Sequence, residues 1–390
     1  MGLNDALARV AVRAAQVLVV ETPGHWRTRV EAEQEIARRG WREARSPADA
    51  DVLAVCGAPG DELADIVERL WDEMPGPRVR AVLSCPGSAC AALDDAAAVL
   101  LDTPHHRRDA EQRPRTPARA GRADMDDHHH GDHGDMDHGD MDHGDMDHGD
   151  MDHGDMDHGG MDMAPEGIPL AEGGEDRDGL EMDVLHLPLG PVLPFWPAGL
   201  VLRCSLQGDL VVGAEVSVVG GRNDKREDGA GATGPGPAPD AAVRCDRIMA
   251  LLALAGAEDA AARARRARDA LLRGDVDAAR SAVERLHRRL RRARLLRWSL
   301  RGVLPLDQSD VERHGLPDTS RGDAHDRLIS RLERIRAGLG SDGAPPVRDD
   351  VVPWAVLPEL VTGLELASVR LAVASLDLDP VLADQAVEHD

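Results

Sequence analysis

The feature that most constrains this chain is a tract that cannot form a packed core. Residues 135–159 read DMDHGDMDHGDMDHGDMDHGDMDHG, five tandem copies of one pentapeptide. The wider window 124–163 draws its forty residues from four types: fifteen Asp, nine His, eight Met and eight Gly. It shows no helical or strand periodicity, and such a composition buries too little apolar surface to order a chain. The sequence therefore predicts a disordered His/Asp/Met/Gly repeat between separately folded parts.

Outside the window 124–163, the charge and the cysteine content are those of an ordinary soluble protein. The net charge is −25, of which the window supplies −15, leaving −10 on the other 350 residues. The cysteines are five in number and widely spaced, with no Cys-x-x-Cys: Cys56, Cys85, Cys90, Cys204 and Cys245. This pattern favours a reducing, cytoplasmic setting over a disulfide framework.

Residues 1–102 alternate short apolar runs with helical patterns. Three runs are predicted to be buried strands: QVLVV (16–20), ADVLAVCG (50–57) and VRAVLSC (79–85). Helical patterns cover 26–39 and 61–74, and an alanine-rich helix ends near Leu101. Alternating strands and helices indicate an α/β domain with a parallel sheet covered by helices. No GxGxxG motif supports a dinucleotide site.

The rest of the chain divides into a linker, a β unit and a helical domain. The predicted boundaries are a linker at 103–178, a small β unit at 179–219, a flexible linker at 220–239 and a mainly α-helical domain at 240–390. The uncharged run 184–202 contains four prolines, which forbid a continuous membrane-spanning helix. A single helix is predicted over 355–376, apolar on more than one face.

An arginine-rich stretch lies in the helical domain. Between Arg263 and Arg301 there are fourteen arginines against four acidic residues. The helix that begins at Val276 has one apolar stripe, so its arginines occupy the remaining faces. That helix lacks interleaved aromatic residues and any recognisable nucleic-acid module, so no nucleic acid is expected as a partner. A solvated face, or an intramolecular partner for the acidic tract, is favoured.

Four ordered stretches of the C-terminal part resemble one family. The segment GDAHDRLISRLERIRAGL (322–339) resembles the Gly-Asp-x-x-x-Arg-x-x-x-Arg-x-x-Glu helix of the large (D-type) catalytic subunit of respiratory complex I, a homologue of the nickel–iron hydrogenase large subunit. Residues 357–385 resemble its closing helix and tail, 189–216 its opening β unit, and 295–316 the segment before the Gly-Asp helix.

The N-terminal part resembles the partner of that large subunit, the small (B-type) iron–sulfur subunit, over residues 48–84. The resemblance implies a fusion of the small and large halves of NADH-quinone oxidoreductase, or of a membrane-bound hydrogenase, with the repeat at the junction. The two halves would pack on each other as the two subunits do. It also implies other subunits of such an assembly as partners, through which the chain would contact the inner face of the membrane.

The departures from this family concern its redox chemistry. The small subunit holds a four-iron cluster with four cysteines, two of them adjacent after the first strand, where this chain reads VVETPGHWR. Such clusters need four thiolates, so a family-type iron–sulfur cluster is not expected. The chain has no tyrosine to serve as the quinone-headgroup residue and no Cys-x-x-Cys pairs for nickel. The family's catalytic residues therefore do not carry over, and no catalytic or cofactor-binding residue is assigned.

The repeat itself is a candidate metal-binding segment. Imidazole suits Ni(II), Cu(II) and Zn(II), and thioether suits Cu(I). Flanking carboxylates favour protonated imidazole, so protons and metals would compete near neutral pH. A low-selectivity chelator of several ions is expected, although a soluble spacer expanded by slippage accounts for the tract equally well. The candidate ligands are His128, His129, His130, His133, His138, His143, His148, His153, His158, Met136, Met141, Met146, Met151 and Met156.

Cys85 and Cys90 could seat a metal with a third ligand, but two partly buried thiols are favoured. Three hypotheses of function remain. The chain is an accessory or assembly component of a redox complex, or a metal-handling protein that acts through its repeat, or an active oxidoreductase subunit that borrows ligands from a partner.

Overall fold

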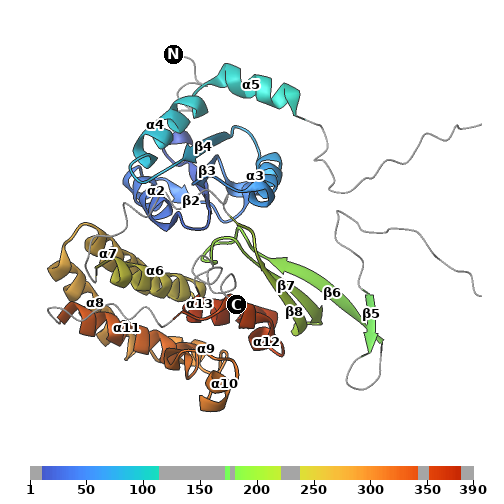
Figure 1. Ribbon diagram of the computed structural model, residues 1–390. Coiled ribbons are helices and arrows are strands. Elements are labelled where there is room, and N and C mark those ends of the chain that lie inside the picture. The colour runs from blue at the N-terminus through green and yellow to red at the C-terminus, as the bar shows by residue number, and fades with distance from the viewer. Residues whose placement is uncertain (1–10, 114–171, 176–180, 221–237, 341–350, 379–390) are drawn as a thin grey trace, which may run out of the picture.

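The computed structural model describes residues 11–113, 172–175, 181–220, 238–340 and 351–378. An α/β unit lies beside a helical unit, and an antiparallel β unit runs outward from the junction between them, next to α12 (Figure 1). The architecture expected from the sequence is confirmed: a parallel sheet with helices, followed by a mainly helical region with an antiparallel β unit.

The N-terminal sheet is parallel and has the strand order β2-β1-β3-β4. Its strands are β1 (Gln16–Glu21), β2 (Arg42–Glu43), β3 (Val52–Cys56) and β4 (Val79–Leu83). All five residues of β3 are buried, as a central strand covered on both faces requires. The three longer strands fall within two residues of the predicted runs. The two-residue strand β2 was not predicted, because no periodicity distinguishes so short a segment.

Helices cover both faces of this sheet. The helices are α2 (Trp26–Arg38), α3 (Asp61–Glu73), α4 (Ala89–Leu100) and α5 (Thr103–Gln112). Val17 packs with Ile36 of α2 and Leu93 of α4 on one face. On the other face, Leu18 packs with Leu63 of α3, because successive strand residues point to opposite sides. Helix α5 occupies the first residues of the segment that the sequence assigned to a linker.

The β unit is an antiparallel sheet in the order β5-β6-β7-β8. Its strands are β5 (Glu172–Glu175), β6 (Glu181–Leu189), β7 (Leu200–Gln207) and β8 (Leu210–Val218). A tight turn at Gly208, with φ of +61°, joins β7 to β8. The proline-rich segment between β6 and β7 is a loop.

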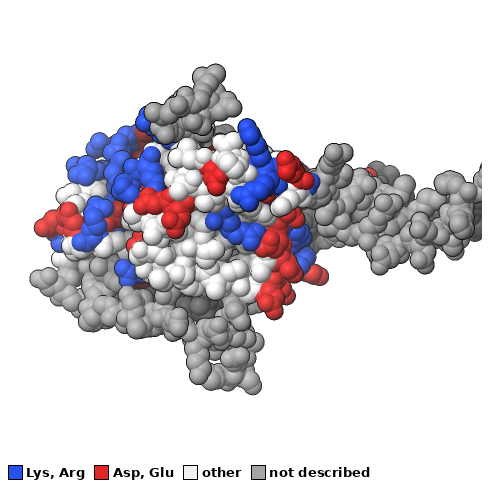
Figure 2. Space-filling view, turned by 90° about the horizontal axis from the view of Figure 1, so that it is seen from above, with Lys and Arg blue, Asp and Glu red and all other residues white. Residues whose placement is uncertain are grey.

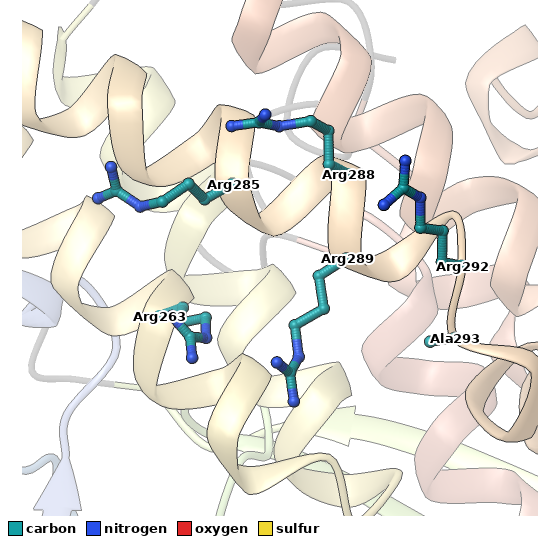
Figure 3. A pocket seen from close by; sticks show the side chains of 6 residues that line it. All are labelled: Arg263, Arg285, Arg288, Arg289, Arg292 and Ala293. Carbon is teal, nitrogen blue, oxygen red and sulfur yellow. The ribbon is translucent and has the colours of Figure 1, made fainter.

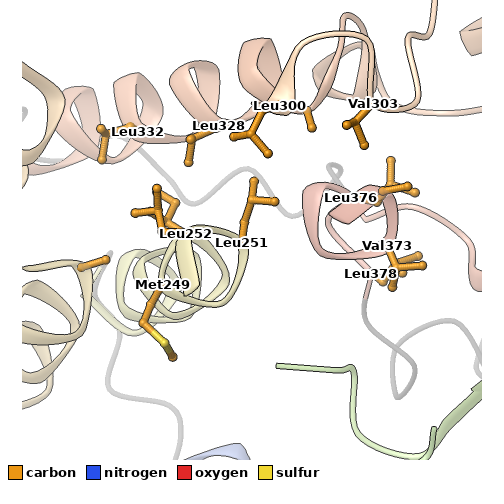
Figure 4. Packing of buried hydrophobic residues seen from close by; sticks show 14 of the residues in the cluster. Met249, Leu251, Leu252, Leu300, Val303, Leu328, Leu332, Val373, Leu376 and Leu378 are labelled. Carbon is orange, nitrogen blue, oxygen red and sulfur yellow. The ribbon is translucent and has the colours of Figure 1, made fainter. Parts of the chain in front are cut away.

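The helical region surrounds α6, which contacts α7, α11 and α13. Its helices are α6 (Ala238–Leu254), α7 (Glu258–Leu272), α8 (Val276–Leu290), α9 (Arg294–Leu300), α10 (Gln308–Arg313), α11 (Ala324–Gly340), α12 (Leu357–Val361) and α13 (Leu366–Ser375). Leu251 and Leu252 of α6 face Leu328 and Leu332 of α11 across the core (Figure 4). The predicted apolar stripe of α8 is buried from Ala279 to Leu290.

The single helix predicted over 355–376 was wrong, because the chain breaks between α12 and α13. Gly363 has φ of +88°, a conformation that no regular helix contains. Its amide donates to the carbonyl oxygen of Val211, and the Val211 amide donates to Leu364. The residues between α12 and α13 therefore form hydrogen bonds with β8. These bonds replace the ones that a continuous helix would have made. Within the described residues, no helix is long and apolar enough to cross a membrane.

Candidate functional site

The predicted ligands of the repeat, residues 128–158, lie outside the described residues. Among the residues that are described, the arrangements that bear on function are one edge of the parallel sheet, two buried ion-pair networks and an arginine-lined pocket.

The carboxyl ends of β1, β3 and β4 meet at one edge of the sheet, which is where open α/β sheets bind ligands. Thr22 follows β1, Gly57 follows β3 and Cys85 lies shortly after β4. The His25 ring packs against Gly57, so closely that a Cβ at that glycine would lie 2.4 Å from ring carbons. Thr22 Oγ1 and His25 Nδ1 are buried without a hydrogen-bond partner in the described part of the chain. This edge is closely packed around His25.

The five thiols do not fit a four-iron cluster at this edge. Cys56 ends β3 and is fully buried, and burial raises the pKa of its thiol. Cys204 of β7 and Cys245 of α6 are buried in the core that the β unit shares with the helical region. Burial there raises the pKa of Cys245 to about 12. Only Cys85 and Cys90 are exposed. Because such a cluster needs four accessible thiolates, the donor set is insufficient.

Cys85 and Cys90 are both exposed, so the expectation that they are partly buried was wrong. Cys85 lies in the loop after β4, and Cys90 lies in the first turn of α4 on its solvent side. The Cys90 sulfur lies 3.8 Å from Arg38 Nη2 and 3.9 Å from Arg39 Nη2. The same sulfur lies 3.8 Å from Asp94 Oδ2, and Asp94 pairs with Arg39, so Cys90 belongs to an exposed arginine–aspartate cluster.

A buried network of charged residues joins α2 to α6 and α7. Asp246 of α6 accepts hydrogen bonds from Trp26 Nε1 at 2.9 Å, Arg29 Nη2 at 2.5 Å and Arg268 Nη1 at 2.6 Å. Arg268 also donates to Glu33 at 2.7 Å and is fully buried. Ion pairs therefore cross between the two units, from Arg29 of α2 to Asp246 of α6 and from Arg268 of α7 to Glu33 of α2.

The network sets the protonation of its carboxyl groups. Burial disfavours the Asp246 carboxylate, but attraction to Arg29 and Arg268 outweighs burial and lowers its pKa to about 2. Glu21, bonded to Arg29 Nε at 2.5 Å, shows the reverse balance. Its burial, together with repulsion from Asp246 and Glu33, outweighs Arg29 and raises the Glu21 pKa. On acidification, Glu21 therefore accepts a proton before Asp246 does.

Apolar and backbone contacts extend this interface. Val201 of β7 and Val219 pack in the same cluster as Leu18 and Leu53 of the parallel sheet. At Gly199, a Cβ would lie 2.6 Å from the Pro23 side chain, so the two halves touch closely there. These interface residues were not predicted from the sequence. The available indication was Arg268, which falls among Ala264, Ala267 and Leu271 on the buried side of α7.

A second buried network joins α11 to the end of α13 and the residues that follow it. Arg327 of α11 donates to Ser375 Oγ from Nε at 3.0 Å and from Nη2 at 2.8 Å. Its remaining hydrogen bonds go to four backbone carbonyls, those of Val303, Leu304, Ser320 and Gly322. Burial and repulsion from Arg331 lower the Arg327 pKa to about 10.

Arg331, one turn further along α11, forms an ion pair with Asp377 at 2.9 Å. Burial disfavours the Asp377 carboxylate, but attraction to Arg331, Arg247 and Arg334 outweighs it and lowers the Asp377 pKa to about 2. This network fixes the chain after α13 to the middle of α11, within the helical core.

Asp323, His325 and Asp326 gather three potential metal-ligating atoms within 4.8 Å of one another. The capping of α11 accounts for this arrangement. Asp323 Oδ1 accepts from the Asp326 amide at 3.0 Å, and Asp326 Oδ2 accepts from the Asp323 amide. This reciprocal pair is a capping box, so the cluster has a structural role without a metal.

Arginines line an open pocket of about 600 Å³ on α7 and α8. Figure 3 shows their guanidinium groups around it. The lining residues are Arg263, Arg285, Arg288, Arg289, Arg292 and Ala293. On the face seen in Figure 2, basic side chains also gather densely on one side. They are arginines, because the only lysine of the chain, Lys225, is outside the described residues.

The pocket concentrates like charges. Arg285 lies three residues before Arg288 and four before Arg289 on α8, and each such like-charged pair on a helix costs about 0.2–0.5 kcal/mol. Arg288 and Arg289 lie in the last turn of α8, where the helix dipole favours cations. That effect does not extend to Arg285, nor to Arg263 in α7. The fold alone therefore does not explain why all five are arginine.

Comparison with known proteins gives one partial similarity. Over 56 residues the chain is 43% identical to the B-type subunit of NADH-quinone oxidoreductase from Bacteroides thetaiotaomicron. The match covers 14% of this chain and 28% of that protein. No protein-family model matches the chain. The similarity to this small subunit is thus weak and partial, and it does not extend to the large catalytic subunit or to a fusion.

Proposed function

We propose that this chain is an accessory or assembly component of a complex-I-like or hydrogenase-like redox complex, without a redox centre of its own. The observation that carries the proposal is the arrangement of the thiols. In a chain with partial similarity to the small subunit of NADH-quinone oxidoreductase, three of five cysteines are buried in packed cores, and only Cys85 and Cys90 reach solvent. The sheet edge after β1 holds Thr22 and His25 instead of thiols.

The proposal includes a large-subunit-like second half packed on the first. It is supported by the network around Asp246 and Arg268, which buries charges of both halves against one another. It is also supported by the contacts of Arg327 and Arg331 with Ser375 and Asp377, since these residues belong to two of the segments that resemble the large catalytic subunit. Membrane contact would occur through partner subunits.

The test begins with the full-length protein, purified anaerobically and incubated with ferrous iron and sulfide. We expect substoichiometric iron and sulfide, and no cluster signal in electron paramagnetic resonance after reduction. Four irons and four sulfides per chain, lost in Cys85→Ser, would contradict the proposal. In the source cells, the tagged chain should co-migrate on native gels with subunits of a proton-pumping or hydrogenase complex, and its absence from every such complex would also contradict it.

A Cys85→Ser/Cys90→Ser chain separates this proposal from a subunit that borrows ligands from a partner. We expect the NADH- or quinone-linked activity of the isolated complex to be unchanged by the double substitution. The matched control is Ser84→Ala, an exposed neighbour in the same loop. Loss of activity in the cysteine variant but not in the control would favour the borrowed-ligand alternative.

A second candidate function, metal handling, is favoured by the nine histidines and fifteen aspartates of 124–163. Elemental analysis of the same preparation, beside a chain lacking 124–163, tests it. Several nickel, copper or zinc ions per chain that disappear with the deletion would support this candidate, and metal-free protein after incubation with each ion would exclude it.

A further inference from the structure

The arginine-lined pocket is not used by the proposed function, and most of its charges lack an acidic partner among the described residues. We define the arginine surface as Arg263, Arg285, Arg288, Arg289 and Arg292. Within the described chain, Arg289 makes the one ion pair of the set, with Asp259 at 3.8 Å between two exposed side chains. Ion pairs between exposed side chains contribute little to stability. The other four guanidinium groups have no carboxylate within ion-pair distance among the described residues.

The shape of the surface suits an extended polyanion better than a small ion. Its guanidinium groups come from two helices and the residue after α8, and they line a wide, open pocket instead of a closed cavity (Figure 3). Four of the five side chains are exposed, and the fifth, Arg263, has a buried Nε without a hydrogen-bond partner. Arginine binds carboxylates through two parallel N–H···O bonds, which fixes geometry as well as charge.

The chain itself contains a matching polyanion. The window 124–163 has fifteen aspartates and no basic residue, and its carboxylates recur every two or three residues. It begins eleven residues after Arg113, the last described residue beyond α5. At about 3.3–3.6 Å per residue, the 58 residues between Arg113 and β5 extend to roughly 200 Å. A folded chain of this length has a radius of gyration of about 21 Å, so reach does not limit contact.

We propose that the arginine surface of α7 and α8 binds the acidic repeat, residues 124–163, of the same chain. Tethering gives the segment an effective concentration on the order of millimolar, so individually weak ion pairs suffice. A nucleic acid is the less suitable occupant, because the net charge of −25 repels it. The contact is electrostatic and therefore weakens as salt screens it, since the Debye length falls to about 3 Å at 1 M salt.

Arginine footprinting on the full-length chain tests the proposal. Phenylglyoxal labelling with mass spectrometry would be compared at low salt and at 1 M salt, in the native chain and in one with every Asp of 124–163 changed to Asn. We expect Arg285, Arg288 and Arg289 to react several-fold more slowly in the native chain at low salt. The protection should disappear at high salt and in the Asp→Asn chain. Arg69, exposed on α3, is the internal control and should react equally throughout.

Three outcomes would overturn the proposal. One is equal labelling of Arg285 and Arg69 in every condition. Another is protection that persists in the Asp→Asn chain, which would assign the surface to a different occupant. The third is tight binding of a fluorescein-labelled single-stranded RNA to the native full-length chain at physiological salt, lost in Arg285→Gln/Arg288→Gln.

The same double variant should show an increased radius of gyration in small-angle scattering if the repeat is bound in the native chain.

Discussion

At the scale of single residues, Asp246 is the centre of the contact between the halves, since three donors from α2 and α7 converge on its two oxygens. Asp246→Asn would remove the charge that Arg29 and Arg268 share while leaving both arginines in place. Breaking a buried ion pair by changing one partner typically costs about 3–5 kcal/mol. We expect a loss of this size in the free energy of unfolding, measured by urea denaturation.

The matched control lies at the rim of the same interface. Glu258 pairs with Arg45 at 3.7 Å, but both side chains are about 80% exposed. Glu258→Gln should therefore change the free energy of unfolding by less than about 0.5 kcal/mol. Equal effects of the two substitutions would show that the interface does not contribute to stability in the way that its geometry indicates.

Residues of this kind are difficult to predict from the sequence. Arg29 and Asp246 are 217 positions apart, and each is a charged residue in a helix that also has an exposed face. Only the packing of α2 on α6 distinguishes them from solvated side chains. Arg327 and Ser375 are 48 positions apart, and their contact depends on how α13 returns to α11.

At the scale of elements, strands were more predictable than the connections between them. Continuous apolar runs located β1, β3 and β4, because a strand covered on both faces excludes polar residues throughout. The interruption between α12 and α13 was not predictable from periodicity, since its hydrogen bonds go to β8, about 150 residues earlier. Likewise, Trp298 of α9 is 80% exposed, which the apolar character of its side chain does not predict.

Two glycines of the β unit provide an element-scale prediction. Gly199 and Gly208 both have positive φ, +75° and +61°, so alanine at either position strains the backbone by about 1–2 kcal/mol. At Gly208 the added methyl group meets nothing within 4 Å, whereas at Gly199 it would meet Pro23 and the Val219 carbonyl oxygen, each at 2.6 Å. We expect Gly199→Ala to cost about 1–3 kcal/mol more than Gly208→Ala.

Urea unfolding followed by tryptophan fluorescence measures both variants. Similar midpoints for the two would mean that the β unit is not held against the loop after β1, and the contact between the halves would then rest on the charged network alone.

At the scale of the whole molecule, the networks make stability depend on pH in two opposite directions. The pKa values of Asp246 and Asp377 are lowered to about 2 in the folded chain, against about 3.9 for an unfolded aspartate. Each therefore contributes on the order of 2 kcal/mol above pH 4, which is lost as the pH falls from about 4 to about 2. Acid should thus weaken both networks over the same pH interval.

Glu21 acts in the opposite direction, because its folded pKa is raised above its unfolded value. The folded chain holds this proton more tightly, so the group favours folding below pH 4.5 and this benefit is lost as the pH rises through its folded pKa. In Glu21→Gln the side chain does not titrate. The stability of Glu21→Gln relative to the native chain should therefore increase from about pH 4.5 upward and then level off. Urea denaturation of both chains between pH 4 and 8 measures the difference. A difference that decreases with rising pH would mean that Arg29 stabilises the Glu21 carboxylate more than burial disfavours it, and that the interface between the halves prefers a fully ionised network.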